Sequence, residues 1–212
     1  MATNRSNGAP SRVVLRVPGV DALTRLAVAA RQGDESALHQ FVEGSYDQVW
    51  RLCARLVDAQ SADDLAQDAF IHAVASLGGF RGDASARTWL LSIARNRCMD
   101  ELRTRTRRRR RDTLVAAAAS SRANPDAGQE IAVTDMLSRL DPERREAFVL
   151  TQMLGLSYEE AAKVCACPIG TIRSRVARAR VHLVDAISAG EPDPASYSNE
   201  SNMYPITRDM TS

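Results

Sequence analysis

The stretch from Ser157 to Arg180, SYEEAAKVCACPIGTIRSRVARAR, most constrains what this chain can fold into, because it predicts two helices joined by a tight turn. Ser157 and Glu160 stand three residues apart, which is the spacing of a capping box that begins a helix. A break at Cys-Ala-Cys ends this helix. Pro168 follows the break, and proline suits the first position of a helix because it has no amide hydrogen to leave unpaired. The pattern indicates a helix-turn-helix.

The second predicted helix has one apolar side and one basic side. Its apolar residues recur every three or four positions and form a single stripe: Ile169, Ile172, Val176, Ala179 and Leu183. Five basic residues and no acidic one lie between 161 and 180. Arginine forks bind guanine edges, and hydroxyl groups contact bases or phosphates, so we interpret this helix as one that enters the major groove of DNA. A solvated basic helix on an unrelated helical protein is the alternative. The candidate DNA contacts are Thr171, Arg173, Ser174, Arg175 and Arg178.

The composition favours a helical protein. A chain of 212 residues can hold one large domain or two small ones, and a hydrophobic share of 44% suffices for a core. Only 5% of the residues are aromatic, and the abundant Ala, Leu and Arg favour helix over strand. The net charge of +2 is small, so the case for a nucleic-acid partner depends on where the charges lie.

The number of cysteines and the length of the apolar runs indicate the cellular compartment of the protein. Four cysteines in a chain of this length do not form the framework of a small secreted protein. No apolar run approaches the roughly 18 residues of a membrane span, and the N-terminus lacks a signal-peptide core. We therefore expect a cytoplasmic protein. Cys165 and Cys167 have no second pair and no nearby histidine to complete a zinc site, so we predict no metal and no cofactor.

A second helix is predicted over residues 61–77, SADDLAQDAFIHAVASL, with Ser61 as its cap. Its apolar residues form an unbroken stripe, and no Lys or Arg occurs between Asp58 and Phe80. Acidic residues in a first turn favour the helix dipole, which explains the early ones well. Asp68 lies deeper, so an acidic ridge that meets a basic protein partner is an equally good interpretation. The ridge comprises Asp64, Gln67 and Asp68.

The remaining pattern predicts an all-α chain of two small helical domains. A loop with three glycines precedes a long helix over about 85–105, and nine arginines lie between 95 and 111. An unbroken arginine run usually indicates disorder or a polyanion-binding arm. We expect a flexible N-terminal arm (1–19), a first domain (20–106), a linker (107–129), a helix-turn-helix domain (130–187) and a disordered polar tail (188–212).

Four segments, in this order, resemble the extracytoplasmic-function sigma factors of the bacterial sigma-70 family: ADDLAQDAF, TWLLSIARNRCMDELR, LDPERREAFVLTQMLGLSYEEAA and PIGTIRSRVARAR. The resemblance covers roughly residues 21–105 and 130–187. It implies a non-catalytic subunit that binds core RNA polymerase through its beta-prime and beta subunits and directs it to promoter DNA. An anti-sigma factor is a further implied partner, and no small-molecule substrate is implied.

The resemblance also implies a role for particular residues. Asp64, Gln67 and Asp68 match the helix that binds the clamp of the beta-prime subunit. Arg173, Ser174 and Arg178 match the helix that reads the minus-thirty-five element. A loop and the long helix after it bind and melt the minus-ten element, where a flipped base is held and phosphates are tracked. The matching residues there are Phe80, Arg81, Asn96, Arg97, Asp100 and Arg103.

Ala86 departs from the family pattern, which often has an aromatic residue before TWL, so contacts near the melting loop differ here.

The alternative function is a helix-turn-helix transcriptional regulator that acts without core polymerase. Such regulators often carry a domain built on strands, and residues 21–105 show no alternating strand pattern. An enzyme is a more distant alternative, since the chain lacks a phosphate-binding glycine loop and a spaced nucleophile and base.

Overall fold

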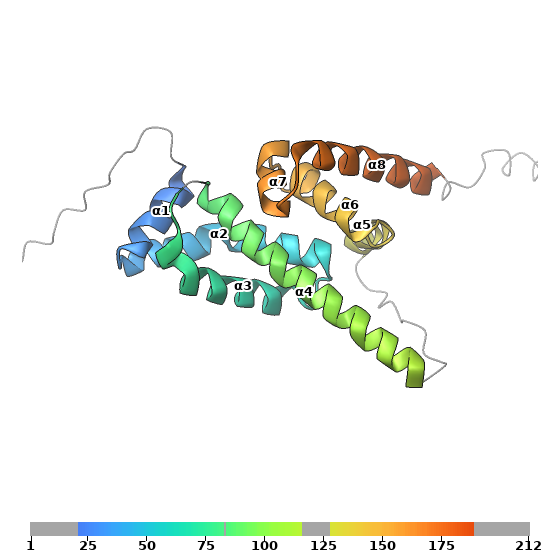
Figure 1. Cartoon of the computed structure of the whole chain (residues 1–212), viewed down its shortest axis with the longest axis horizontal. Helices are drawn as coiled ribbons and strands as arrows, with labels where there is room; N and C mark the ends of the chain where they lie inside the picture. Colours follow the sequence, from blue (N-terminus) through green and yellow to red (C-terminus); the bar gives the residue numbers. More distant parts are fainter. Residues whose placement is uncertain (1–20, 83, 116–127, 189–212) are drawn as a thin grey trace, which may run out of the picture.

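The computed structural model describes residues 21–82, 84–115 and 128–188 of the chain. All regular structure in these ranges is helical, which confirms the predicted all-α class (Figure 1). Most of the predicted N-terminal arm, linker and C-terminal tail lies outside the described residues, so the prediction that they are flexible or disordered is not tested.

The first helical unit consists of α1 (Ala22–Arg31), α2 (Glu35–Leu56), α3 (Ala62–Ser76), the short 3-10 turn η1 (Leu77–Gly79) and the first half of α4 (Ala86–Val115). Asp21 and Asp34 cap α1 and α2 by accepting hydrogen bonds from the backbone amides of Thr24 and Ala37. The buried residues of α2, α3 and α4 form the core, and the rings of Tyr46 and Phe70 stack at 5.9 Å between centroids.

The long helix α4 differs from its predicted length. It continues to Val115 and therefore includes Arg107–Arg111, which the sequence assigned to the linker. Arginine is a good helix former, and neither Gly nor Pro interrupts this segment. Arg105 also anchors the helix, since it pairs with Glu101 one turn earlier and with Asp58, which follows α2.

The second unit consists of α5 (Gly128–Ser138), α6 (Pro142–Phe148), the π-helical turn η2 (Val149–Met153), α7 (Tyr158–Cys165) and α8 (Ile169–Ser188). The predicted capping box of Ser157 and Glu160 is confirmed, with both of its hydrogen bonds formed. Ala166 turns the chain between α7 and α8 in a left-handed conformation with φ of 50°. Pro168 lies just before α8 rather than inside it, and its carbonyl accepts the amide of Thr171.

The two units are in contact. Helix α7 packs against α4, and α6 and η2 pack against α2, so the second unit covers one side of the first (Figure 1). The sequence analysis predicted two domains on a flexible linker and did not predict this packing. The arrangement brings two helices that carry predicted DNA contacts, α4 and α8, to either side of α6 and α7.

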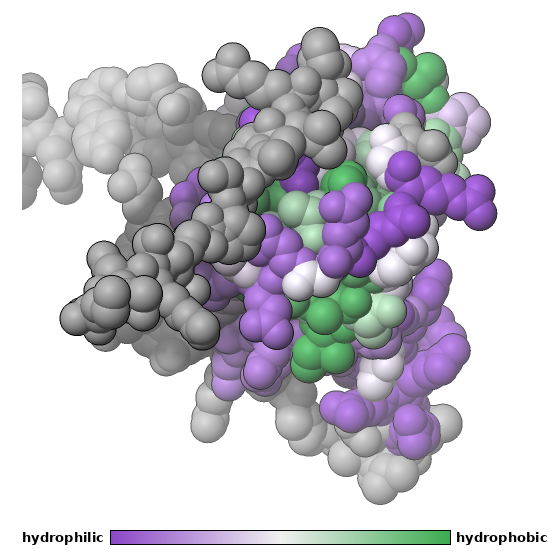
Figure 2. Space-filling model, turned by 90° about the vertical axis from the view of Figure 1, so that its left-hand side faces the viewer, coloured by the Kyte–Doolittle hydropathy of each residue, from purple (hydrophilic) through white to green (hydrophobic). Residues whose placement is uncertain are grey.

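The surface of the molecule is mainly polar on the side seen in Figure 2, with separate hydrophobic patches among hydrophilic side chains. Among the described residues, no helix is both long enough and apolar enough to cross a bilayer. The same residues contain no group of three or more His, Cys, Asp or Glu side chains arranged to hold a metal ion.

Candidate polymerase and promoter interface

The acidic ridge lies on the outer side of α3. Asp64 and Gln67 are exposed and Asp68 is half-buried, while the apolar stripe of the same helix enters the core through Ala66, Ala69 and other residues. Ser61 does not cap α3 with its side chain, contrary to the sequence prediction. Its hydroxyl accepts a hydrogen bond from Arg105 instead, because α4 passes beside the start of α3. The carboxylates of the ridge are nevertheless open to a partner.

The deepest carboxylate of the ridge contacts α4. Asp68 lies 3.6 Å from Nε2 of His72 and 4.0 Å from the guanidinium of Arg97. Arg97 also lies 3.3 Å from the ring of His72 and 3.2 Å from the carboxylate of Asp100. Asp100 in turn accepts a hydrogen bond of 3.1 Å from Arg103. Asp68, Arg97, Asp100 and Arg103, all predicted as site residues, therefore form one chain of contacts from α3 to the exposed side of α4.

The loop before α4 carries two predicted DNA contacts, of which Phe80 is buried and Arg81 is exposed. The side chain of Phe80 is only 4% exposed, and its ring lies 5.0 Å from that of Trp89. The backbone carbonyl of Phe80 accepts a hydrogen bond of 2.9 Å from Arg31. Arg81 is exposed. In this conformation Phe80 is not available to a flipped base, in contrast to the expectation from sequence, because the apolar ring is packed into the core under the loop.

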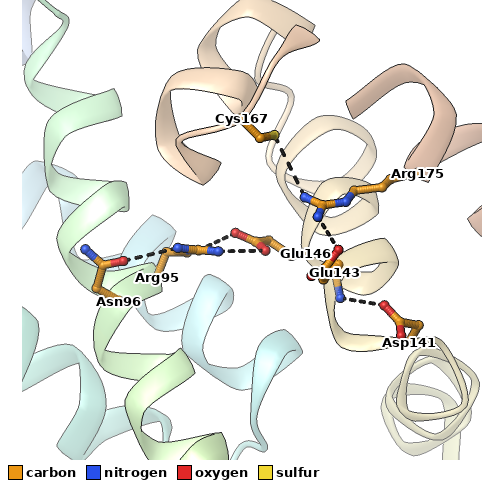
Figure 3. A network of polar contacts seen from close by, with 7 residues as sticks. All are labelled: Arg95, Asn96, Asp141, Glu143, Glu146, Cys167 and Arg175. Atoms are coloured by element: carbon orange, nitrogen blue, oxygen red, sulfur yellow. Dashed lines mark hydrogen bonds and ion pairs between the residues drawn. The ribbon is translucent and has the colours of Figure 1, made fainter. Parts of the chain in front are cut away.

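Asn96 is exposed on α4, next to an ion pair that joins the two units. Arg95 pairs with the carboxylate of Glu146 on α6, with its Nη2 atom 3.2 Å from Oε2, and also donates to the side chain of Asn96 (Figure 3). Burial alone would lower the pKa of Arg95, but the hydrogen bonds and charge of Glu146 raise it above its ordinary value. Arg95 is therefore firmly cationic in a partly buried position.

The recognition helix α8 has the two sides that its sequence predicts. Ile172, Val176 and Ala179 are buried against α6 and α7, while Arg173, Ser174 and Arg178 are exposed. Thr171 is half-buried, and its carbonyl accepts a hydrogen bond of 3.0 Å from the hydroxyl of Ser174. The exposed basic side of α8 is free to face a nucleic acid.

Arg175 differs from its neighbours on α8. Its guanidinium forms an ion pair with Glu143 of α6 and lies 3.8 Å from the sulfur of Cys167 (Figure 3). Asp141, at the start of α6, accepts the backbone amide of Glu143 and so fixes the turn that carries this carboxylate. Arg175 is therefore engaged within the second unit, unlike Arg173 and Arg178.

The contact between the two units contains polar residues that sequence reasoning missed. Arg87 of α4 donates to Oε1 of Gln48 at 2.7 Å and to the carbonyl of Leu154 across the interface. Arg145 of α6 donates to the carbonyl of Leu56 at 3.1 Å. The sequence contained one signal of this contact, the carboxylate of Glu146. Helical periodicity places Glu146 on the same inner side as the apolar residues of α6 and η2. A charge in such a position requires a partner.

Three of the four cysteines lie in the core. Cys53, Cys98 and Cys165 are buried as free thiols, and Cys167 is half-buried. Contact with Cys53 and burial raise the pKa of the Cys98 thiol, and burial together with the nearby Glu146 raises that of Cys165. The raised pKa values favour the neutral form of the Cys98 and Cys165 thiols, which suits apolar packing.

An exposed acidic ridge, a long arginine-bearing helix and a basic helix-turn-helix in one helical chain define a DNA-binding transcription protein with a surface suited to a protein partner. Residues 41–108 match the family described as Sigma-70 region 2, and residues 130–183 match that described as Sigma-70, region 4. The chain belongs to the extracytoplasmic-function sigma factors of the sigma-70 family and acts in transcription initiation. The alternative of a regulator that acts without polymerase is not favoured.

Individual relatives agree with this assignment over most of the chain. It is 44% identical over 180 residues to the probable RNA polymerase sigma-C factor of Mycobacterium bovis, covering 82% of this chain and 94% of that protein. It is 36% identical to the RNA polymerase sigma-H factor of Pseudomonas aeruginosa, covering 74% and 89%. Among solved structures, it is similar to CnrH in complex with the cytosolic domain of CnrY, with a TM-score of 0.64, 29% identity and coverage of 81% and 100%.

Proposed function

We propose that this sigma factor binds core RNA polymerase through the ridge of α3 and reads promoter DNA with α4 and α8. Asp64, Gln67 and Asp68 would contact basic residues of the beta-prime clamp, with further contacts to the beta subunit. Arg81, Asn96, Arg97 and Arg103 would contact the minus-ten element, and Arg173, Ser174 and Arg178 the minus-thirty-five element. Phe80 would support the melting loop from the core. Thr171, Arg175 and Asp100 would position their neighbours. Thr171 contacts Ser174, and Arg175 contacts the carboxylate of Glu143. Asp100 contacts Arg97 and Arg103.

The observation that carries this proposal is the separation of charge on the surface. The carboxylate of Asp64 on α3 and the guanidinium groups of Arg173 and Arg178 on α8 are exposed and lie on different units of the molecule. A negative surface steers a positive protein partner, while arginines on an exposed helix bind phosphates and base edges. Each surface therefore suits one partner and repels the other.

The geometry of a promoter requires the two units to separate. The minus-ten and minus-thirty-five elements lie about 25 base pairs apart, which corresponds to about 85 Å at roughly 3.4 Å per base pair. Two small domains in contact cannot bind both elements at once. Twelve residues separate the end of α4 from the start of α5, and an extended chain of that length would reach about 40 Å. We therefore propose that the packed arrangement is a form of the chain that precedes promoter binding.

The proposal includes the remaining partners. CnrH, a similar protein, is solved with the cytosolic domain of CnrY, and a similar sigma factor from Bartonella quintana is solved with the anti-sigma factor NepR. By analogy, an anti-sigma factor would hold this chain inactive. The protein would work as an initiation factor without catalytic activity, cofactor or small-molecule substrate. It would act in the cytoplasm, where the polymerase and the chromosome are.

The direct test is co-purification with core polymerase followed by transcription from genomic fragments. The full chain should bind core polymerase and give specific initiation, whereas Asp64→Arg and Asp68→Arg should abolish binding because they reverse the charge of the ridge. Asp47→Arg is the matched control, since Asp47 is exposed on α2 outside the ridge. Loss of binding in the control as well, or retention in both ridge variants, would contradict the assignment of the ridge.

A further inference from the structure

An apolar groove lies between α5 and the second half of α8, and it is open to solvent among the described residues. Its volume is about 460 Å³. Hydrophobic side chains from α5, α6 and α8 form most of its lining: Val133, Met136, Leu137, Phe148, Leu183 and Val184. All the lining residues belong to the second unit, so the contact between the two units does not close the groove.

The side chains of this groove are more exposed than those of the core. Val184 is 59% exposed and Val133 is 39% exposed, while Phe148 and Leu183 are half-buried. Contiguous apolar surface with polar groups around it marks a site of interaction. Sites of about 300–1,000 Å³ hold small ligands, so this groove fits a few side chains rather than the face of another domain.

Arg180 is the charged residue among those that line the groove. Its guanidinium is exposed, and Nη2 donates to Oε1 of Gln152 at 2.6 Å, which joins α8 to η2. The groove therefore combines apolar side chains with a positive charge. A fitting occupant has apolar side chains of its own and a net negative charge.

The chain that follows α8 has both properties in its sequence. Residues 189–212 contain four acidic residues and one basic residue. Their hydrophobic side chains are densest from Met203 to Ile206, around Pro205. The residue before a proline favours extended backbone, and in an extended chain side chains two positions apart point to the same side. Tyr204 and Ile206 would therefore enter a groove together.

This segment is long enough to return to the groove. Val184 lies four residues before Ser188, the last residue of α8, which is about 6 Å along a helix axis. Fifteen residues lead from Ser188 to Met203, and an extended chain of that length spans up to about 50 Å. A tethered segment meets a nearby site at an effective concentration on the order of millimolar. This favours the chain's own segment over the same segment of a second copy.

We propose that residues 203–206 dock in the groove between α5 and α8, with Tyr204 and Ile206 against its apolar side chains. The acidic residues of the same tail would lie near Arg180. The tail thereby covers an apolar face of the second unit, and a protein partner can use that face only after the tail has left. Arg173 and Arg178 do not line the groove, so the docking is independent of the proposed DNA contacts.

Hydrogen–deuterium exchange of the full chain, without any partner, tests the docking. A site with a dissociation constant of about 0.1 mM, at an effective concentration of about 1 mM, slows exchange at Tyr204 and Ile206 about tenfold below the intrinsic rates. Val184→Asp places a carboxylate in the groove and should remove this protection. Val181→Asp is the matched control, since Val181 is 62% exposed on the same helix and lies outside the groove, and it should leave the protection unchanged.

A variant of the tail completes the test. Ile206→Asp changes the segment alone, so it should remove the protection without any effect on the folded unit, and thermal unfolding of each variant verifies that the fold is retained. Exchange at the intrinsic rates in the parent chain would overturn the proposal. So would protection that persists in Val184→Asp, or that is lost equally in Val181→Asp. Protection that increases with protein concentration would show that the groove takes the segment of a second copy, which also overturns docking within one chain.

Discussion

Arg95 on α4 and Glu146 on α6 form an ion pair that joins the two helical units, and Glu146 is only 1% exposed (Figure 3). A carboxylate at such depth is stable as an ion only with a charged or hydrogen-bonding partner. Arg95 supplies that partner from the other unit. The packed arrangement of the two units therefore supplies the partner that the buried carboxylate of Glu146 requires.

Glu146→Gln should loosen the contact between the units. The amide keeps the shape of the side chain but loses the charge that pairs with Arg95, and we expect a loss of about 1–3 kcal/mol in the free energy of unfolding. Small-angle X-ray scattering should show a larger radius of gyration. Asp135→Asn is the control, because it removes an exposed pair between Asp135 of α5 and Arg139 just after that helix, and it should leave the radius unchanged. An unaltered radius for Glu146→Gln would show that the pair does not hold the units together.

Phe80→Ala should destabilise the first unit. The ring is almost fully buried against Trp89, and truncation of a buried Phe costs about 3–5 kcal/mol through lost contacts and the cavity left behind. Chemical denaturation measures this loss. Arg81→Ala, at the adjacent exposed position, should change stability by less than about 0.5 kcal/mol and weaken DNA binding instead. Equal stability of Phe80→Ala and the parent chain would contradict a packing role.

Arg178→Ala should weaken binding to promoter DNA in a way that identifies the contact. If the guanidinium binds a base edge, the loss should be about 1–3 kcal/mol at one base position and disappear when that position is changed. Binding to a series of single-base promoter variants measures this pattern. An equal loss on every sequence would indicate a phosphate contact, and no loss on any sequence would remove Arg178 from the interface.

The contact of Asp58 with Arg105 predicts a dependence of stability on pH. Burial alone would raise the pKa of Asp58, but hydrogen bonds from Arg105 and from Ser61 lower it below its ordinary value. A carboxyl with a lowered pKa in the folded state stabilises the fold above its unfolded pKa, and this contribution is lost as the pH falls through the folded value. Asp58→Asn should therefore lower the melting temperature at pH 7, with a difference from the parent chain that shrinks at acidic pH. A constant difference down to about pH 3 would contradict this, since the unfolded pKa is about 3.9.

The thiols should react in an order set by burial. Cys167 is half-buried beside Arg175, whereas Cys53, Cys98 and Cys165 are buried, the last two with raised pKa values. Alkylation of the native protein, followed over time by mass spectrometry, should modify Cys167 first. Fast modification of Cys165 would show that the turn between α7 and α8 opens readily. Cys167→Ser should remove the fast phase.

Local patterns along the chain determined the elements and most of the candidate surfaces. The three- and four-residue spacing of Ile172, Val176 and Ala179 fixed which side of α8 is buried, since a helix has a known period. The same reasoning placed Asp64 and Gln67 on an exposed side of α3. These features depend only on neighbours in sequence, so the sequence by itself determined them.

The tertiary structure alone decided which distant residues meet. Helix α4 is held beside the end of α2 because Arg105 contacts Asp58, 47 residues earlier in the chain. Phe80 turns inward because Trp89 offers a ring to pack against, and Glu146 is buried because Arg95 arrives from another unit. Such pairs are set by how helices pack against one another, and no periodicity within a helix encodes its partner in space.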